Sequence, residues 1–291
     1  INTMKYKIIN NKHKEKGIVM ENKYSKEGNQ QVKQKERLVN YDYKTDFKFE
    51  VVKVESKNHT EELETIIGEF PLALVINNEY SNTFLCTPEN LEQLVAGFLM
   101  TKGVIKSKAD IKSIEVDFEN RVANTVIDKN EDSDKGKRYY LNDLDYVDLK
   151  PIENTDTTIR VSDIYEVMKE NLTSSELFKN TGGVHSVAIY DNKTLLTIRE
   201  DVARHNAMDK SIGYCILNNI DLKDKIIFVS GRISCEMILK AAKAGIPIVV
   251  SKSAPTNLSR EIAKKLNITL AGFVRGERMN IYTNPERIIF E

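Results

Sequence analysis

The stretch IIFVSGRISCEMILKAAKAGIPIVVS, at residues 226–251, alternates apolar runs with a helical segment, and the alternation continues to residue 274. The expected order is strand 226–230, helix 235–244, strand 246–251, helix 257–266 and strand 268–274. Continuous apolar runs are typical of strands that are covered on both faces, and this spacing suits right-handed crossovers between parallel strands. We therefore predict an α/β domain whose mixed, partly parallel sheet has at least three parallel strands at its centre.

The residues before this stretch extend the same domain. Their apolar periodicity predicts a helix over 161–178, strands over 187–190 and 195–198, and a helix from about 202 to 217. We assign residues 158–291 to this α/β domain.

Residues 47–157 predict a smaller, β-rich subdomain with a single helix over 87–102. Thr87 can cap that helix and Pro88 suits its first position, just after Cys86. The expected strands are a half-buried one at 47–55, a hairpin of 71–76 with 83–86, and a second hairpin of 111–118 with 121–127. A charged loop over 130–136 marks the approach to the next domain.

The charges are unevenly distributed along the chain. It holds 43 Lys and Arg against 43 Asp and Glu, but its first forty residues are strongly basic and carry few clustered apolar side chains. We therefore expect residues 1–46 to be a disordered basic tail, which leaves an acidic body. An acidic body lacks the basic face that nucleic-acid binding requires, so no nucleic-acid partner is expected.

The cysteine content and the apolar runs indicate the compartment. The chain has three scattered cysteines, too few for a disulfide framework or a four-cysteine zinc site. No apolar run approaches the ~20 residues that a membrane span needs. A reduced, cytoplasmic protein without a membrane partner is expected.

Three loops follow the carboxyl ends of the predicted parallel strands, where open α/β sheets bind their ligands. Such loops and the helix N-termini behind them suit an anion, because they offer free N–H groups and close backbone approach. Their candidate ligand-binding residues are Ser230, Gly231, Arg232, Lys252, Ser253, Arg275 and Arg278. These loops indicate an anionic, nucleotide-like ligand, although ordinary turn chemistry with solvated basic residues also explains each loop taken singly.

Two histidines near this edge are further candidates. Helical spacing would align Asp201, His205 and Asp209 along one face, as a proton carrier or a structural link. The turn Thr181-Gly-Gly-Val-His185 delivers a second imidazole. The H-x-E and P-C-x-x-C signature of zinc deaminases is absent after His185, so no metal site is expected.

Several motifs together resemble the FdhD-type formate dehydrogenase accessory proteins, over roughly residues 50–285. They are Leu85-Cys-Thr-Pro-Glu-Asn-Leu91, Val95-Ala-Gly-Phe-Leu99, Thr181-Gly-Gly-Val-His185, Glu200-Asp-Val-Ala-Arg-His-Asn-Ala-Met-Asp-Lys210, Ser230-Gly-Arg-Ile-Ser234 and Gly272-Phe-Val-Arg-Gly276 with the residues up to Thr283.

This resemblance implies a sulfur carrier. Such a protein takes sulfur from a cysteine desulfurase and passes it to the molybdenum or tungsten bis-molybdopterin guanine dinucleotide cofactor before that cofactor enters formate dehydrogenase. It also implies a homodimer and a three-layer C-terminal domain similar to cytidine deaminase without the zinc ligands. The implied contact with the GDP-like part of the cofactor falls on Phe273, Val274, Arg275, Gly276, Glu277 and Arg278.

The chain departs from the family at one point. Members carry a persulfide-bearing cysteine in a loop before the Thr-Gly-Gly-Val-His turn, but the corresponding residues 137–154 contain no cysteine. Sulfur transfer requires a thiolate that can receive and release a sulfur atom. Cys86 is the remaining candidate, because a helix dipole at 87–88 would lower its pKa; the alternative is a small apolar residue that ends a buried strand.

Two functions therefore remain open from the sequence. One is a sulfurtransferase with an unconventional thiol or a thiol supplied by a partner. The other is a cofactor-binding chaperone that transfers no sulfur.

Overall fold

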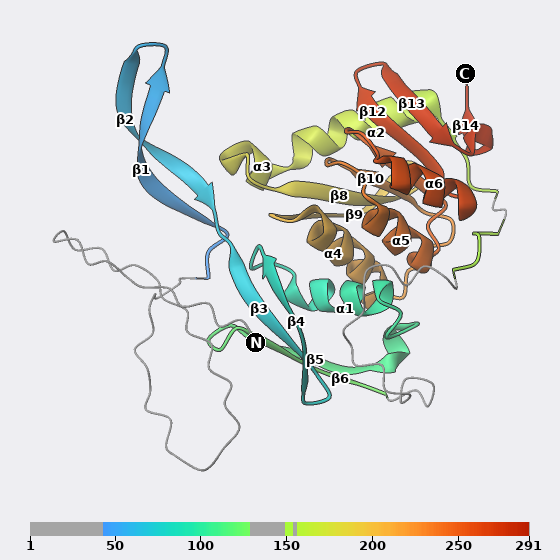
Figure 1. The fold of residues 1–291 in the computed structure, drawn as a ribbon, viewed down its shortest axis with the longest axis horizontal. Helices are drawn as coiled ribbons and strands as arrows, with labels where there is room; N and C mark the ends of the chain where they lie inside the picture. The colour runs from blue at the N-terminus through green and yellow to red at the C-terminus, as the bar shows by residue number, and fades with distance from the viewer. Residues whose placement is uncertain (1–42, 129–148, 154–155, 291) are drawn as a thin grey trace. The chain divides into compact units, whose positions relative to one another are not determined.

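A six-stranded mixed sheet forms the centre of the C-terminal part (Figure 1). The computed structural model describes residues 43–128, 149–153 and 156–290. The sheet has the order β13-β12-β11-β10-β8-β9. Its strands are β8 (His185–Asp191), β9 (Thr194–Asp201), β10 (Ile226–Val229), β11 (Ile248–Ser251), β12 (Thr269–Arg275) and β13 (Arg278–Thr283). Strands β10, β11 and β12 are parallel, which confirms the predicted parallel core, and the outer strands pair antiparallel.

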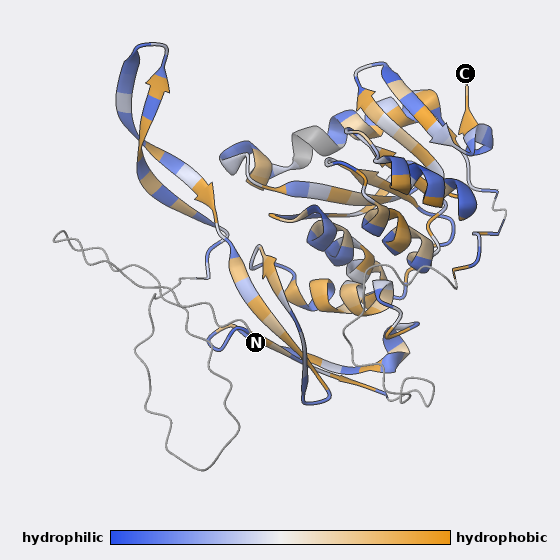
Figure 2. Ribbon diagram, viewed as in Figure 1, coloured by the Kyte–Doolittle hydropathy of each residue, from blue (hydrophilic) through white to orange (hydrophobic). Residues whose placement is uncertain are grey.

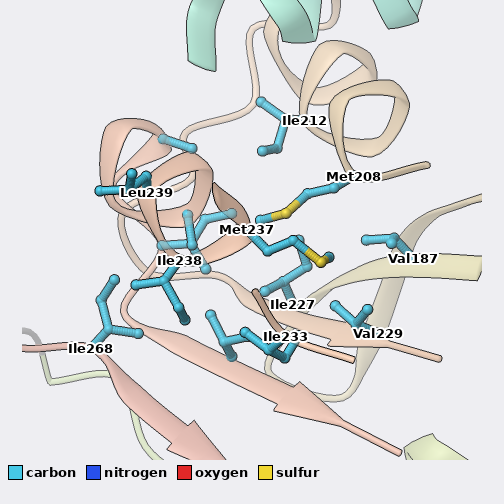
Figure 3. Close-up of a cluster of buried hydrophobic side chains, with 14 of the residues drawn as sticks. Val187, Met208, Ile212, Ile227, Val229, Ile233, Met237, Ile238, Leu239 and Ile268 are labelled. Carbon is cyan, nitrogen blue, oxygen red and sulfur yellow. The ribbon is translucent and has the colours of Figure 1, made fainter. Parts of the chain in front are cut away.

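Helices cover both faces of this sheet and make three layers. On one face pack α4 (Arg204–Leu217), α5 (Cys235–Ala244) and α6 (Asn257–Lys265); on the other packs α2 (Val161–Ser174). Figure 3 shows the first interface, where Met208 and Met237 from the helices meet Val187, Ile227 and Val229 from the sheet. Because both faces are buried, β10 is apolar throughout and β11 is apolar up to its last residue, Ser251.

A four-stranded sheet with the order β4-β3-β6-β5 precedes this domain. Its strands are β3 (Phe70–Ile76), β4 (Glu79–Cys86), β5 (Ile111–Asp117) and β6 (Val122–Ile127). Both predicted hairpins are confirmed, and β3 pairs with β6 in parallel to join them. Helix α1 (Leu91–Thr101) covers the sheet face that carries Leu72, Leu74 and Ile76.

Helix α1 begins later than the sequence predicts. Its N-cap is Asn90, in the left-handed conformation at φ 53°, and not Thr87. The hydroxyl of Thr87 accepts a hydrogen bond from the Val202 backbone N–H at 3.2 Å, and its own N–H donates to Asp201 Oδ2 at 3.0 Å. The predicted helix start at Thr87 is therefore wrong, because tertiary contacts with β9 occupy the groups that would have capped the helix.

Helices α1 and α4 cross in close contact, and two glycines allow it. A Cβ at Gly97 would lie 1.8 Å from the carbonyl oxygen of Asp209, and a Cβ at Gly213 would lie 1.8 Å from that of Gln93. Helix α1 therefore packs against the four-stranded sheet on one side and α4 on another. This explains its predominantly hydrophobic sequence (Figure 2).

A separate hairpin, β1 (Asp46–Glu55) with β2 (Asn58–Ile67), precedes the four-stranded sheet. The sequence analysis predicts β1 as half-buried and misses β2, whereas most side chains of both strands are exposed. Strand β2 has apolar side chains only at Leu63, Ile66 and Ile67, so it lacks the regular alternation that marks a strand in the sequence.

Short elements complete the described chain. They are the 3-10 turns η1 (Lys108–Asp110) and η3 (Pro285–Arg287), the helix α3 (Glu176–Thr181), and the parallel pair β7 (Ile159–Arg160) and β14 (Ile288–Ile289). The predicted helix 161–178 is thus divided, with Ser175 between α2 and α3. The predicted tail at 1–46 and the loop at 130–136 lie almost wholly outside the described residues.

Candidate anion-binding site

A cavity of about 270 Å³ lies at the carboxyl ends of β10 and β11. It is lined by the α2–α3 junction, the Gly182-Gly183 turn, the start of β8 and the loops after β10 and β11. Three of the predicted candidates, His185, Ser230 and Lys252, line it together. The sheet topology accounts for this convergence, because parallel neighbours end on the same edge.

Backbone hydrogen bonds hold the loops after β10 and β11 against each other. The N–H of Ile233 donates to Ala254 O at 3.1 Å, and the N–H of Thr256 donates to Ile233 O at 3.0 Å. The Ser251 hydroxyl donates to Gly231 O at 2.7 Å. Ser230, Gly231, Arg232, Lys252 and Ser253 therefore belong to one continuous edge of the sheet.

The third loop joins this edge through β12. The N–H of Phe273 donates to Ser253 O at 3.1 Å, beside an irregular register between Gly272 and Arg275. Phe273 has a φ of 55°, a left-handed conformation that costs a bulky residue about 1–3 kcal/mol. The Arg275 guanidinium lies 5.8 Å from the centre of the Phe273 ring.

The implied cofactor-contact segment lies farther out along the chain. Within the described residues, none from 273 to 278 lines the cavity. Val274 is buried, while Arg275, Gly276, Glu277 and Arg278 are exposed at the β12–β13 turn. The structure thus places this segment next to the Ser253 loop but outside the cavity wall.

His185 lies among cations at the cavity. Burial, followed by the charges of Arg204 and Arg232, lowers its pKa below the usual value. A Cβ at Gly231 would lie 2.9 Å from His185 Nδ1, so the glycine makes room for the imidazole ring, and Arg204 Cδ would be in ordinary contact at 3.6 Å. The Nε of Arg204 is buried and, among the described residues, has no hydrogen-bond partner. A buried guanidinium N–H without a partner is unfavourable unless a ligand or a water satisfies it.

The nearby carboxylates are already paired, and the cations are not. Asp201 contacts Lys210, and Glu200 accepts a hydrogen bond from the Ser175 hydroxyl. In the part of the chain that the structure describes, no carboxylate forms an ion pair with Arg204, Arg232 or Lys252. The edge therefore has an excess of positive charge, which favours an anion.

The predicted alignment of Asp201, His205 and Asp209 on one helix face is wrong. Asp201 belongs to β9, because α4 begins only at Arg204. Its Oδ2 lies 2.6 Å from Lys210 Nζ, with both side chains fully buried. Asp209 Oδ2 lies 2.8 Å from Lys240 Nζ, while His205 is exposed.

Arg204 and Lys210 are two important residues that the sequence patterns do not single out. Lys210 Nζ also donates to the carbonyl oxygens of Thr87, at 2.9 Å, and Glu200, at 3.2 Å, so it links β9 and α4 to the end of β4. Both residues lie in the segment 199–210 that carries part of the family resemblance. Lys210 is fully buried, on a helix whose other buried polar residues are Asn206, Asp209 and Ser211.

None of the three cysteines has the setting of a reactive thiolate. Burial raises the pKa of Cys86 to about 12, and its Sγ donates to Phe70 O at 3.4 Å. The dipole argument for Cys86 does not hold, because α1 begins at Leu91 and the thiol is fully buried. Burial likewise raises the pKa of Cys215 to about 12 and raises that of the half-buried Cys235.

The described residues contain neither a metal site nor a membrane-spanning helix. No group of three or more His, Cys, Asp or Glu side chains there is placed to hold a metal ion. No helix in the same residues is long and apolar enough to cross a membrane.

Comparisons with known proteins agree on one family. Residues 67–289 match the FdhD/NarQ family. The chain is 40% identical over 239 residues to the sulfur carrier protein FdhD of Bacillus subtilis (strain 168), covering 77% of this chain and 90% of that protein. It is 38% identical over 242 residues to the sulfur carrier protein FdhD of Staphylococcus aureus (strain N315), covering 77% and 89%.

A solved structure is also similar. The crystal structure of a protein from Desulfotalea psychrophila, described as a formate dehydrogenase accessory protein, matches with a TM-score of 0.72 and 28% identity. The match covers 84% of this chain and 100% of that one. The extent of these matches and the shared motifs show that the chain belongs to the FdhD/NarQ family.

Proposed function

We propose that this chain is a formate dehydrogenase accessory protein that binds the molybdenum or tungsten bis-molybdopterin guanine dinucleotide cofactor as its cargo and serves the delivery of sulfur to it. The observation that carries the proposal is the set of cations Arg204, Arg232 and Lys252, which have no ion-pair partner among the described residues, beside the cavity at the carboxyl ends of β10 and β11. Diphosphate groups are the part of such a cofactor that these cations suit.

The end of β12 and the β12–β13 turn fit the nucleotide end of that cargo. Arg275 and Arg278 are exposed and can reach phosphate oxygens, while the ring of Phe273 is 39% exposed and can stack on a purine. Phe178 offers a second exposed ring at the cavity. The left-handed backbone of Phe273 supports a binding role, because such strain persists where function requires it.

The sulfur step has two candidate forms. In the first, the chain conveys sulfur from a cysteine desulfurase to the cofactor. In the second, it holds the cofactor as a chaperone and carries no persulfide itself. The burial and raised pKa values of the cysteine thiols favour the second form, because a thiolate is the species that accepts sulfane sulfur.

Mass spectrometry distinguishes the two forms. The full chain is incubated with a cysteine desulfurase and cysteine and then analysed intact and after digestion. A gain of one sulfur mass on any cysteine supports covalent transfer. The absence of an adduct on protein that still supports formate dehydrogenase maturation establishes the chaperone form.

GDP binding tests the cofactor assignment. We expect Arg275→Ala and Arg278→Ala each to weaken GDP binding by about 1.5–3 kcal/mol, the range for hydrogen bonds to charged groups, without unfolding the protein. Arg260→Ala is the control, since Arg260 pairs with Glu261 on the α6 surface. Unchanged affinity in both test variants contradicts the assigned contact.

The resemblance also supports the wider proposal. A cysteine desulfurase and formate dehydrogenase would be the protein partners of a cytoplasmic homodimer. Residues 158–291 would then form the cofactor-binding domain, similar in fold to cytidine deaminase, and residues 47–157 a β-rich subdomain.

A further inference from the structure

We propose that the cavity at the carboxyl ends of β10 and β11 binds a divalent oxyanion together with one proton, which the imidazole of His185 takes up from solvent. This inference rests on the proposed function, because it concerns how the same cavity recognises a phosphate group of its cargo. In this proposal, protonation of His185 favours the binding of a doubly charged anion.

His185 lines the cavity, and its imidazole is the group that we expect to take up the proton. Its side chain is half-buried at the start of β8, and it shares the cavity lining with Lys252 and Ser230. Gly231 lies against the Nδ1 side of the ring with no room for a Cβ. The ring therefore lies close to the Gly231 backbone and also borders the space that a ligand would occupy.

Charged groups face this imidazole from several elements. Arg204 and His205 belong to α4, Arg232 follows β10, and Lys252 follows β11 at the cavity wall. The facing acidic group is Asp201 on β9. Its charge is offset by Lys210 at 2.6 Å and by the N–H groups that it accepts from.

A second carboxylate lies near the cavity, that of Glu200 on β9. It accepts a hydrogen bond from Ser175, which lines the cavity. With that bond in place, and with Asp201 paired, the field at His185 is dominated by cations. This agrees with the lowered pKa of the imidazole.

A divalent anion reverses this balance. In the free protein, burial and the neighbouring cations hold His185 in its neutral form near pH 7. A dianion among the same cations compensates their charge and attracts a proton to the ring, so the pKa of His185 rises in the complex. The buried Nε of Arg204, which has no partner among the described residues, is a second group that such an anion can satisfy.

Linkage gives the sign and size of the pH dependence. The complex holds one proton more than the free protein. The affinity for the anion therefore increases as the pH falls below the His185 pKa in the complex. It stops increasing once the pH is below the His185 pKa in the free protein. The total increase is about tenfold for each pH unit by which the anion raises the His185 pKa. A nucleotide cargo would accordingly bind more weakly as the pH rises.

The experiment uses the full chain and sulfate, whose double charge does not change across the pH range of interest. Calorimetric titration between about pH 5.5 and 7.5, in buffers of different ionisation enthalpy, measures both the affinity and the number of protons taken up. We expect tighter binding at the lower pH and a net uptake that approaches one proton per sulfate. His185→Asn should lose both, whereas the matched control His59→Asn, at an exposed residue of β2, should keep both.

Three outcomes overturn the proposal: no sulfate binding at either pH, binding without proton uptake, or proton uptake that persists in His185→Asn. A parallel titration with GDP at a single alkaline pH keeps the proposed function separate. If GDP binds there while sulfate shows no proton linkage, the cofactor role stands and the role of His185 does not.

Discussion

The buried pair of Lys210 and Asp201 should be a large contributor to the stability of this protein. Lys210→Met keeps most of the side-chain volume and removes the charge that lies 2.6 Å from the carboxylate. Asp201 is then left as an uncompensated buried anion, although the N–H groups of Thr87 and Ala203 still donate to it at 3.0 Å. Two backbone carbonyls, on Thr87 and Glu200, also lose a donor.

The magnitude follows from the complete burial of both side chains. Breaking a buried ion pair by removing one partner costs about 3–5 kcal/mol. This is a large part of the 5–15 kcal/mol that typically separates folded and unfolded states, and in a chain of this size it lowers Tm by roughly 6–20 °C. The double variant Lys210→Met with Asp201→Asn should recover part of the loss, because no unpaired charge remains.

Thermal and urea unfolding, followed by circular dichroism, provide the measurement. Lys112→Met is the matched control, because Lys112 and its partner Asp128 are both exposed and such pairs contribute little. If Lys210→Met unfolds within 2 °C of the wild type, or no lower than the control, the structural role of this pair is refuted.

Three further predictions concern the thiols and two glycines. At pH 8 a thiol with a pKa of about 12 is ionised to roughly one part in ten thousand, so iodoacetamide should modify only Cys235 in the folded protein and all three cysteines in urea, as counted by mass spectrometry. Gly213→Ala should destabilise strongly, because its Cβ would lie 1.8 Å from Gln93 O; unfolding near the wild-type temperature would contradict this. Gly231→Ala should displace the His185 ring and weaken sulfate binding while Tm changes little.

The sequence was most informative where local pattern and tertiary role agree. Helix α5 was predicted at its observed bounds, because its apolar face is regular and Gly245 ends it in the left-handed conformation. The three parallel strands were equally clear, since each carries a continuous run of apolar residues, as expected of strands buried on both faces.

Predictions from local sequence were wrong where contacts with distant residues determine the structure. The Thr87-Pro88 signal suggested a helix start, but Thr87 bonds instead to Asp201 and Lys210, more than a hundred residues away. Strand β2 was missed because an exposed strand needs no apolar alternation.

The sequence predicts the part of the site that depends on strand topology, but not the part that depends on which charges are paired. The edge formed by Ser230 and Lys252 follows from parallel topology, which the sequence shows. The unpaired state of Arg204 does not follow from sequence, because it depends on Asp201 being paired with Lys210. Only the three-dimensional arrangement shows which charges are compensated and which remain available.

The central claim is that the positive charges beside the cavity at the carboxyl ends of β10 and β11 bind the diphosphate of a guanine nucleotide. A crystal structure of the protein with GDP tests it most directly. The claim predicts phosphate oxygens within hydrogen-bond distance of Lys252 or Arg204, and the guanine near Phe273. A nucleotide bound elsewhere, with these side chains unchanged and free of phosphate, would contradict it.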